Sequence, residues 1–142
     1  MVSAAHTDRE LMNTLANFEQ VGKRGFYRPF CTVTFERAVE MVAEAMRQAR
    51  SLGLSELLVN TMGFTGFAAP SIFARHTLAV SWAASAGSGL TVAMVARPEL
   101  IDPEKIGVLM AQNRGANGDV FASEAAALAW LDARIGGSAT IP

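Results

Sequence analysis

The sequence contains little charge and few reactive side chains. Charged residues make up only 18% of its 142 positions, and twelve basic against thirteen acidic residues give a net charge of -1. Proteins that bind nucleic acids neutralise phosphates with clustered lysine and arginine, so this balance argues against nucleic-acid binding. The single cysteine, Cys31, excludes an internal disulfide and is ordinary in a reducing cytosol. We interpret it as a small apolar residue rather than a nucleophile.

Signals for metals, cofactors and catalysis are also missing. The two histidines, His6 and His76, have no cysteine or carboxylate at ligand spacing, so no zinc site is expected. The glycines form neither a G-x-G-x-x-G nor a Walker pattern between a strand and a helix, so no nucleotide cofactor is expected. No nucleophile–base pair or acid–base pair can be assembled from the residues, which predicts that the protein is not an enzyme.

No targeting or membrane-spanning segment is expected either. The first ten residues lack a basic segment followed by an apolar one, which favours a cytoplasmic location without a secretory signal. The charge-free run from Thr77 to Ala96 reaches spanning length. However, Gly87-Ser88-Gly89 interrupts it with a turn signal. The run therefore predicts the end of a helix, a turn and a buried strand.

What the sequence does contain is enough apolar material for one globular domain, since 51% of its residues are hydrophobic. The domain is organised around residues 54–74. Leu57-Leu58-Val59 is typical of a strand buried on both faces, and the polar residues Asn60 and Thr61 follow it. A loop with Gly63, Thr65 and Gly66 then leads to a helix that Ser71 caps. Open α/β folds bind their ligands at this kind of strand–loop–helix junction.

Helical and strand patterns alternate from residue 34 onward. Helices are expected over residues 34–52, 70–86, 103–113 and 124–135, and strands over residues 57–59, 90–96 and 119–121. Thr34 begins the first helix and Gly53 ends it, while Asp102 and Ser123 cap the last two. This order predicts an α/β fold with a mainly parallel sheet and about four helices.

An N-terminal hairpin is expected in front of this alternation. Its proposed parts are a first arm, a four-residue turn and a second arm, at Phe18–Val21, Gly22–Gly25 and Phe26–Phe30. Pro29 would confine the second arm to a sheet edge or end it early. Thr7 and Glu10 have capping-box spacing, so a short helix before the hairpin is also considered.

The helix expected over residues 70–86 is apolar almost all the way round, with Arg75 and His76 as its only charge-capable residues. A helix of this kind must be covered on all sides. The sheet would cover one side, so we expect a second copy of the chain on the other, giving a homodimer through this helix.

The chain resembles the STAS/SpoIIAA-like family of small α/β domains, which extends to the CRAL-TRIO-type lipid-binding fold. The residues that carry the resemblance are the strands Leu57–Asn60 and Val92–Val95, the turn Asn113–Gly115, the run Val120–Leu131, and the loop signals Thr65-Gly66-Phe67 and Pro70-Ser71. We accordingly divide the chain into an N-terminal extension (1–17), a STAS/SpoIIAA-like domain (18–135) and a flexible tail (136–142).

The resemblance implies a non-enzymatic bacterial regulatory module that acts by binding another protein. In well-understood family members a serine at the start of the helix after the central strand is phosphorylated, and Ser71 is the matching position. The alternative for Ser71 is that its hydroxyl only caps the helix.

Six residues at the strand ends and in the loop are the candidate binding residues: Asn60, Thr61, Thr65, Phe67, Ser71 and Arg97. Arg97 ends a predicted strand at the same sheet edge as Ser71, and the two would form an anion site. A different hypothesis makes the protein a binder or sensor of a small apolar or lipid-like ligand. Its pocket would be lined by Phe64, Phe67, Phe73 and Trp82.

Overall fold

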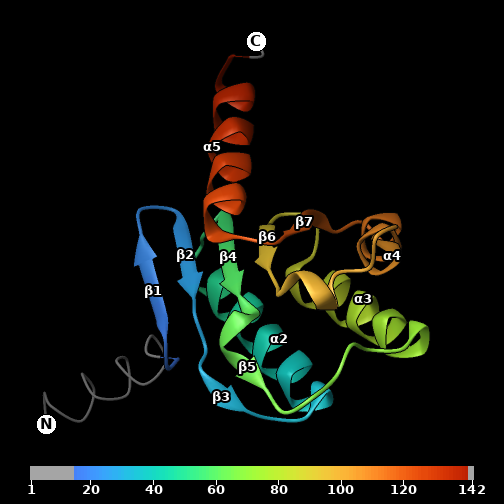
Figure 1. The fold of residues 1–142 in the computed structure, drawn as a ribbon. Coiled ribbons are helices and arrows are strands. Elements are labelled where there is room, and N and C mark those ends of the chain that lie inside the picture. Colours follow the sequence, from blue (N-terminus) through green and yellow to red (C-terminus); the bar gives the residue numbers. More distant parts are fainter. Residues whose placement is uncertain (1–14, 141–142) are drawn as a thin grey trace, which may run out of the picture.

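The structure is a computed structural model that describes residues 15–140, with side chains described through residue 134. Its main sheet has five strands in the order β1-β2-β4-β6-β7: β1 (Phe18–Val21), β2 (Arg24–Tyr27), β4 (Glu56–Asn60), β6 (Thr91–Val95) and β7 (Asn117–Phe121). The α-helices of this range are α2 (Phe35–Ser51), α3 (Ile72–Ala86), α4 (Ile106–Asn113) and α5 (Glu124–Thr140). Strands β1 and β2 are antiparallel and the other pairs are parallel (Figure 1). The predicted α/β fold with an N-terminal hairpin is confirmed.

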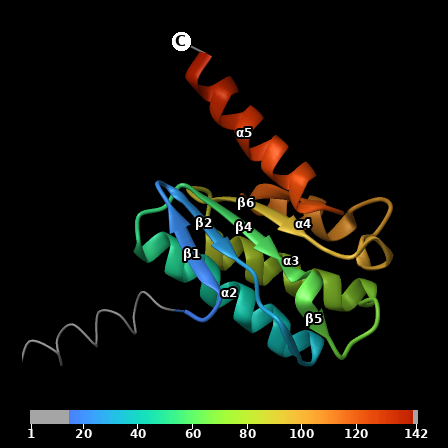
Figure 2. The ribbon, with the colours of Figure 1, turned by 60° about the vertical axis from the view of Figure 1, so that its left-hand side comes forward.

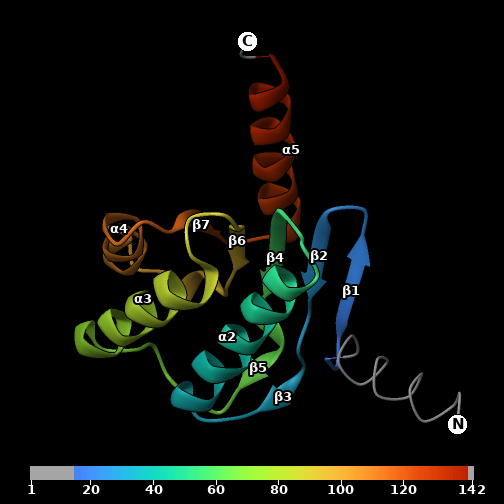
Figure 3. The same ribbon diagram turned by 180° about the vertical axis from the view of Figure 1, so that it is seen from behind.

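The helices cover the two faces of the sheet unequally. Helices α2 and α3 lie side by side on one face, and α5 lies on the other (Figures 2 and 3). The α2–α3 face holds the larger core, which includes Tyr27, Met46, Leu57, Val59, Trp82 and Val92. The α5 face holds a smaller cluster of Leu58, Ala93, Val95, Ala127 and Leu131. The C-terminal end of α5 points away from the sheet (Figure 1).

Strand β4 is the centre of the sheet, paired in parallel with β2 on one side and β6 on the other. Because side chains alternate between faces, Leu57 and Val59 enter the larger core and Leu58 the smaller one. All three side chains are fully buried. The apolar run therefore fills a strand covered on both faces, as predicted.

Helix α2 begins and ends where its sequence predicts. The hydroxyl of Thr34 accepts a hydrogen bond from the Arg37 backbone N–H (3.1 Å). Gly53 follows the helix with φ +73°, a left-handed conformation that glycine adopts without a steric cost.

The hairpin turn differs from the prediction. The turn consists of Gly22 and Lys23 alone, and the second arm is Arg24–Tyr27 rather than Phe26–Phe30. Gly22 has φ +60°, which suits the first position of a two-residue hairpin turn. Strand β2 lies inside the sheet and ends before Pro29, whose missing N–H would leave a ladder bond unmade.

A second, two-stranded sheet was not expected. Strand β3 (Cys31–Thr32) pairs in parallel with β5 (Phe64–Thr65), inside the predicted loop. The hydroxyls of Thr32 and Thr65 hydrogen-bond across the pair (2.8 Å). This pairing ties the loop after β4 to the segment before α2.

Three helix boundaries also differ, and the first is that α3 begins at Ile72, after its N-cap Ser71, rather than at residue 70. Helix α4 begins at Ile106 rather than Pro103, although the carboxylate of Asp102 still accepts from the Ile106 backbone N–H (2.9 Å). Helix α5 continues to Thr140, beyond the expected end at Ile135. The helix considered at Thr7 and the histidine His6 lie outside the described residues.

The described part of the chain contains no helix long and apolar enough to cross a membrane. The charge-free run Thr77–Ala96 consists of the end of α3, a turn and β6, as predicted.

The burial of Tyr27, the only tyrosine of the sequence, predicts that the stability of the fold depends on pH. Its side chain is 1% exposed, and burial raises its pKa to about 12. Because this pKa lies above the ordinary value of 10.0, the neutral phenol stabilises the fold below pH 10. That stability, about 3 kcal/mol, is lost as the pH rises from 10 through 12. Ultraviolet titration should find tyrosinate forming near pH 12 in the native protein and near pH 10 in denaturant. Coincident titrations would contradict the burial of Tyr27.

Candidate functional site

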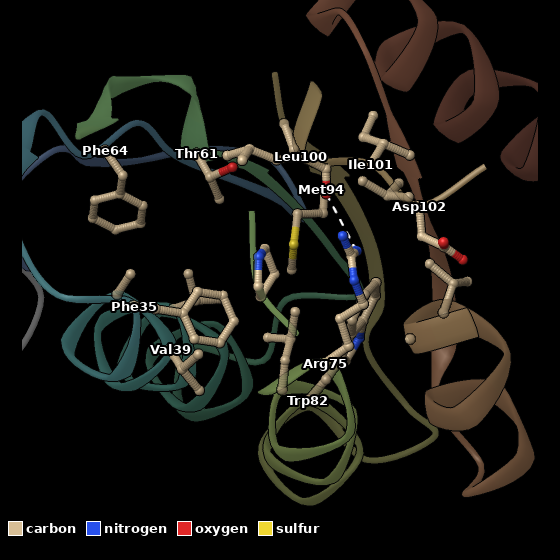
Figure 4. A pocket seen from close by; sticks show the side chains of 18 of the residues that line it. Phe35, Val39, Thr61, Phe64, Arg75, Trp82, Met94, Leu100, Ile101 and Asp102 are labelled. Carbon is tan, nitrogen blue, oxygen red and sulfur yellow. Dashed lines mark hydrogen bonds between the residues drawn. The ribbon is translucent and has the colours of Figure 1, made fainter. Parts of the chain in front are cut away.

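A cavity of about 110 Å³ lies at the carboxyl ends of the central parallel strands (Figure 4). The floor is formed by Met94 of β6, and Thr61 lies at the end of β4. Helix α2 contributes Phe35 and Val39 to one wall. Helix α3 contributes Leu78 and Trp82, and the segment after β6 contributes Leu100 and Ile101. The lining is almost entirely apolar.

Local structure explains why these residues meet. Met94 points to the α2–α3 side because it alternates with Ala93 and Val95, which face α5. The loop between β5 and α3 brings Phe67 over the start of α2, where its ring meets Phe35 edge-on with centroids 5.5 Å apart. The cavity is therefore built from segments far apart in the sequence.

Three charged side chains reach the cavity wall. Lys105 Nζ donates to Asp119 Oδ1 (2.8 Å) and to the Val120 carbonyl oxygen (3.0 Å). The Asp102 carboxylate accepts a hydrogen bond from the Ile106 backbone N–H at the start of α4. Arg75 of α3 reaches across to the segment after β6, where its Nη1 donates to the Leu100 carbonyl oxygen (3.2 Å; Figure 4).

The side chains of Arg75 and Lys105 differ in the charge of their hydrogen-bond partners. The bond from Lys105 is an ion pair, whereas Arg75 donates to a neutral carbonyl and forms no ion pair with an acidic side chain of the described residues. A guanidinium has five N–H donors. Arg75 is therefore the one cation of the wall whose charge no carboxylate of the described chain balances within ion-pair distance.

Trp82 anchors α3 to the sheet beside the cavity. Its side chain is 3% exposed, and its Nε1 has no hydrogen-bond partner among the described residues. The indole packs against Gly118 of β7, where a Cβ atom would lie 2.5 Å from Trp82 Cζ2. A larger residue at 118 would push Trp82 away from the sheet.

The side chain of Asn60, at the end of β4, forms a hydrogen bond to α5. Asn60 Nδ2 donates to Glu124 Oε2 (2.8 Å), and Asn60 Oδ1 accepts from the Met62 backbone N–H (2.9 Å). Glu124 also pairs with Arg28, whose Nε lies 2.7 Å from the carboxylate. The hydrogen bond from Arg28 lowers the pKa of Glu124, and the bond from Asn60 adds to this effect. Both polar ends of the Asn60 amide thus have protein partners, and Asn60 does not line the cavity.

Two of the other predicted binding residues line the cavity and two do not. Thr61 lines the cavity, and its hydroxyl donates to the Val95 carbonyl oxygen (2.7 Å). Phe67 also lines it. Thr65 lies in the β3–β5 pair, and the Ser71 hydroxyl caps α3 by accepting from the Ala74 N–H (3.1 Å).

Arg97 does not form the expected anion site with Ser71. Its Nη2 donates to the Phe64 carbonyl oxygen (2.6 Å), which fixes β5 to the end of β6. Its Nε is buried without a partner among the described residues, and Arg97 is absent from the cavity wall. The guanidinium therefore supports the loop rather than facing the cavity.

The apolar-pocket hypothesis named three of the lining residues, Phe64, Phe67 and Trp82. Phe73, the fourth, is 79% exposed and lies outside. Sequence reasoning missed Arg75 and Leu100 as wall residues. The available signal was the placement of one arginine in an otherwise apolar helix directly after the candidate loop.

Helix α3 is covered on one side only. Ala79, Trp82 and Ala86 are buried, whereas Ile72 and Phe73 are mostly exposed. The sheet and the neighbouring helices α2 and α4 account for the buried side. The other side of α3 carries an exposed stripe of Ile72, Phe73, His76, Thr77 and Val80, which the rest of the described chain does not bury.

No family model matches this sequence, and no curated protein or solved structure matches it.

Proposed function

We propose that this protein works by binding a small apolar molecule in the cavity between α2, α3 and the carboxyl ends of β4 and β6, without catalysing a reaction. The carrying observation is the cavity itself, with an almost wholly apolar lining at the sheet edge where open α/β folds bind ligands. Protein interiors are close-packed, and a void that no side chain fills costs stability. A bound ligand offsets that cost because it binds only the folded state.

The hydrogen bonds of the polar candidates also favour this function over a phospho-switch. Asn60, Ser71 and Arg97 each have a protein partner that explains their position. The wall offers a ligand mainly apolar contact, with charge only at Arg75, Asp102 and Lys105.

Val39→Phe tests the proposal, because the added ring enters the cavity from α2. We expect the variant to lose binding of single-ring aromatic ligands by at least about tenfold while keeping its melting temperature, since the ring replaces the ligand's contacts. Binding is followed by the fluorescence of Trp82 in a Trp130→Phe background, which leaves one tryptophan beside the cavity.

Val80→Phe is the matched control, because Val80 is on α3 but 37% exposed and outside the cavity. It should bind ligand like the parent protein. Equal binding by Val39→Phe and Val80→Phe would contradict the cavity as the binding site.

A regulatory interaction module of the STAS/SpoIIAA-like type is the second candidate. This candidate is supported by the mainly parallel sheet that follows an N-terminal hairpin. The exposed apolar side chains Ile72, Phe73 and Val80 in the stripe on α3 also support it. We propose a second copy of the chain as the partner for this stripe, because isologous pairing of one helix face is the commonest symmetric arrangement.

The dimer is tested by light scattering coupled to size exclusion. The parent protein should elute with the mass of two chains, and Phe73→Asp with the mass of one, since a charge would be buried at the helix pair. A monomeric parent protein would refute the dimer and leave the cavity proposal unaffected.

A further inference from the structure

We propose that the ligand of this cavity is a small monocarboxylic acid, with its apolar part inside the cavity and its carboxylate bound by Arg75. This inference rests on the proposed binding function and adds the chemical class of the ligand.

The cavity volume limits the apolar part. At about 110 Å³ the cavity is somewhat smaller than an engineered cavity of about 150 Å³ that stays dry and holds benzene in another protein. The enclosed part of the ligand is therefore about one aromatic ring or a short branched chain.

The charged side chains at the cavity wall determine which polar group a ligand can carry. Lys105 is balanced by Asp119, and the Asp102 carboxylate accepts from the start of α4. Among the described residues the Arg75 side chain makes one hydrogen bond, to the Leu100 carbonyl oxygen, and keeps further N–H donors. An acceptor group with negative charge is the complement of such a side chain.

Geometry favours a carboxylate for this role. A guanidinium binds a carboxylate through two parallel hydrogen bonds, which fixes the orientation of the ligand as well as its charge. Arg75 is half-buried, so water screens this pair less than it screens a surface ion pair. Asp102 at the same wall would repel a second negative charge, which favours a monoanion over a phosphate dianion.

The test compares phenylacetate with 2-phenylethanol, which have the same ring and similar length but differ in charge. The fluorescence of Trp82 in the Trp130→Phe background measures both affinities. The parent protein should bind the acid at least about tenfold more tightly than the alcohol, as expected for a charge-assisted pair.

Arg75→Met should remove this preference, since methionine keeps an apolar stem but has no donor. Its affinity for the alcohol should change less than about threefold, which also shows that the cavity is intact. Arg75→Lys keeps the charge but not the paired donors and should retain part of the preference. Arg114→Met, a change at an exposed arginine outside the cavity, should leave both affinities unchanged.

Equal affinities of the parent protein for acid and alcohol would overturn the assignment of Arg75 while leaving the apolar cavity in place. An unchanged preference in Arg75→Met would overturn it as well. If neither probe bound, and neutral aromatics of similar size also failed to bind, the proposed function itself would fall together with this inference.

Discussion

Gly118→Ala is expected to destabilise the fold by about 3 kcal/mol, at the upper end of the usual cost of overpacking a core. Gly118 is a buried residue of β7, and a Cβ atom there would overlap the carbonyl oxygen of Val92 on the neighbouring strand. It would also lie 2.5 Å from Trp82 Cζ2. The backbone of a paired strand moves little, and Trp82 is held between α3 and the sheet, so neither neighbour gives way easily.

Gly89→Ala is the matched control for this experiment. A Cβ atom at Gly89 would meet no heavy atom within 4 Å, and its backbone is not in the left-handed region. Chemical denaturation should therefore find less than about 0.5 kcal/mol of change for Gly89→Ala. Similar losses at both glycines would contradict the packing of Trp82 on β7.

Arg24→Met is expected to cost about 3 to 5 kcal/mol, because it leaves the carboxylate of Glu56 buried without its partner. Glu56 is 5% exposed, and Arg24 Nε donates to its Oε1 at 2.8 Å. Arg24 also reaches Asp132 of α5 (2.9 Å), so the same side chain joins the hairpin, the central strand and the C-terminal helix. Burial of the pair makes its loss far more costly than the loss of a surface ion pair.

Arg37→Met provides the comparison, since its partner Glu40 is largely exposed. Equilibrium denaturation should give a change below about 1 kcal/mol for this variant. The double variant Arg24→Met, Glu56→Met should recover much of the lost stability, because no buried charge remains. A double variant as unstable as Arg24→Met would show that the cost does not come from the unpaired carboxylate.

Local sequence patterns predicted those parts of the fold whose causes are local. The apolar helix face, the N-cap Thr34 and the terminating Gly53 predicted the position of α2. The unbroken apolar run Leu57–Val59 predicted the central strand. The hairpin turn was misplaced because the register of β2 also depends on β4, whose paired residues lie 32 positions further along the chain (Arg24 with Glu56). The β3–β5 pair depends on contacts between distant segments for the same reason.

The sequence predicted the sheet edge at which the cavity lies, but not all of the residues that line it. The strand–loop–helix junction lies at the sheet edge where the cavity is found, and its residues Thr61 and Phe67 line the cavity. Sequence could not tell that Arg97 would turn to the Phe64 carbonyl while Arg75 lines the cavity. Arg75 lies in α3 and Arg97 comes directly after β6, and each donates to a carbonyl oxygen of a segment distant in the sequence.

Methyl NMR spectra recorded during titration with toluene test the binding cavity most directly. Toluene is uncharged, so its binding does not depend on Arg75. The account predicts shifts for Leu78, Met94 and Val108, which line the cavity, and none for Leu58 and Leu131, which lie in the core under α5. Spectra without ligand-induced shifts, or shifts equally large under α5, would contradict the cavity as the functional site.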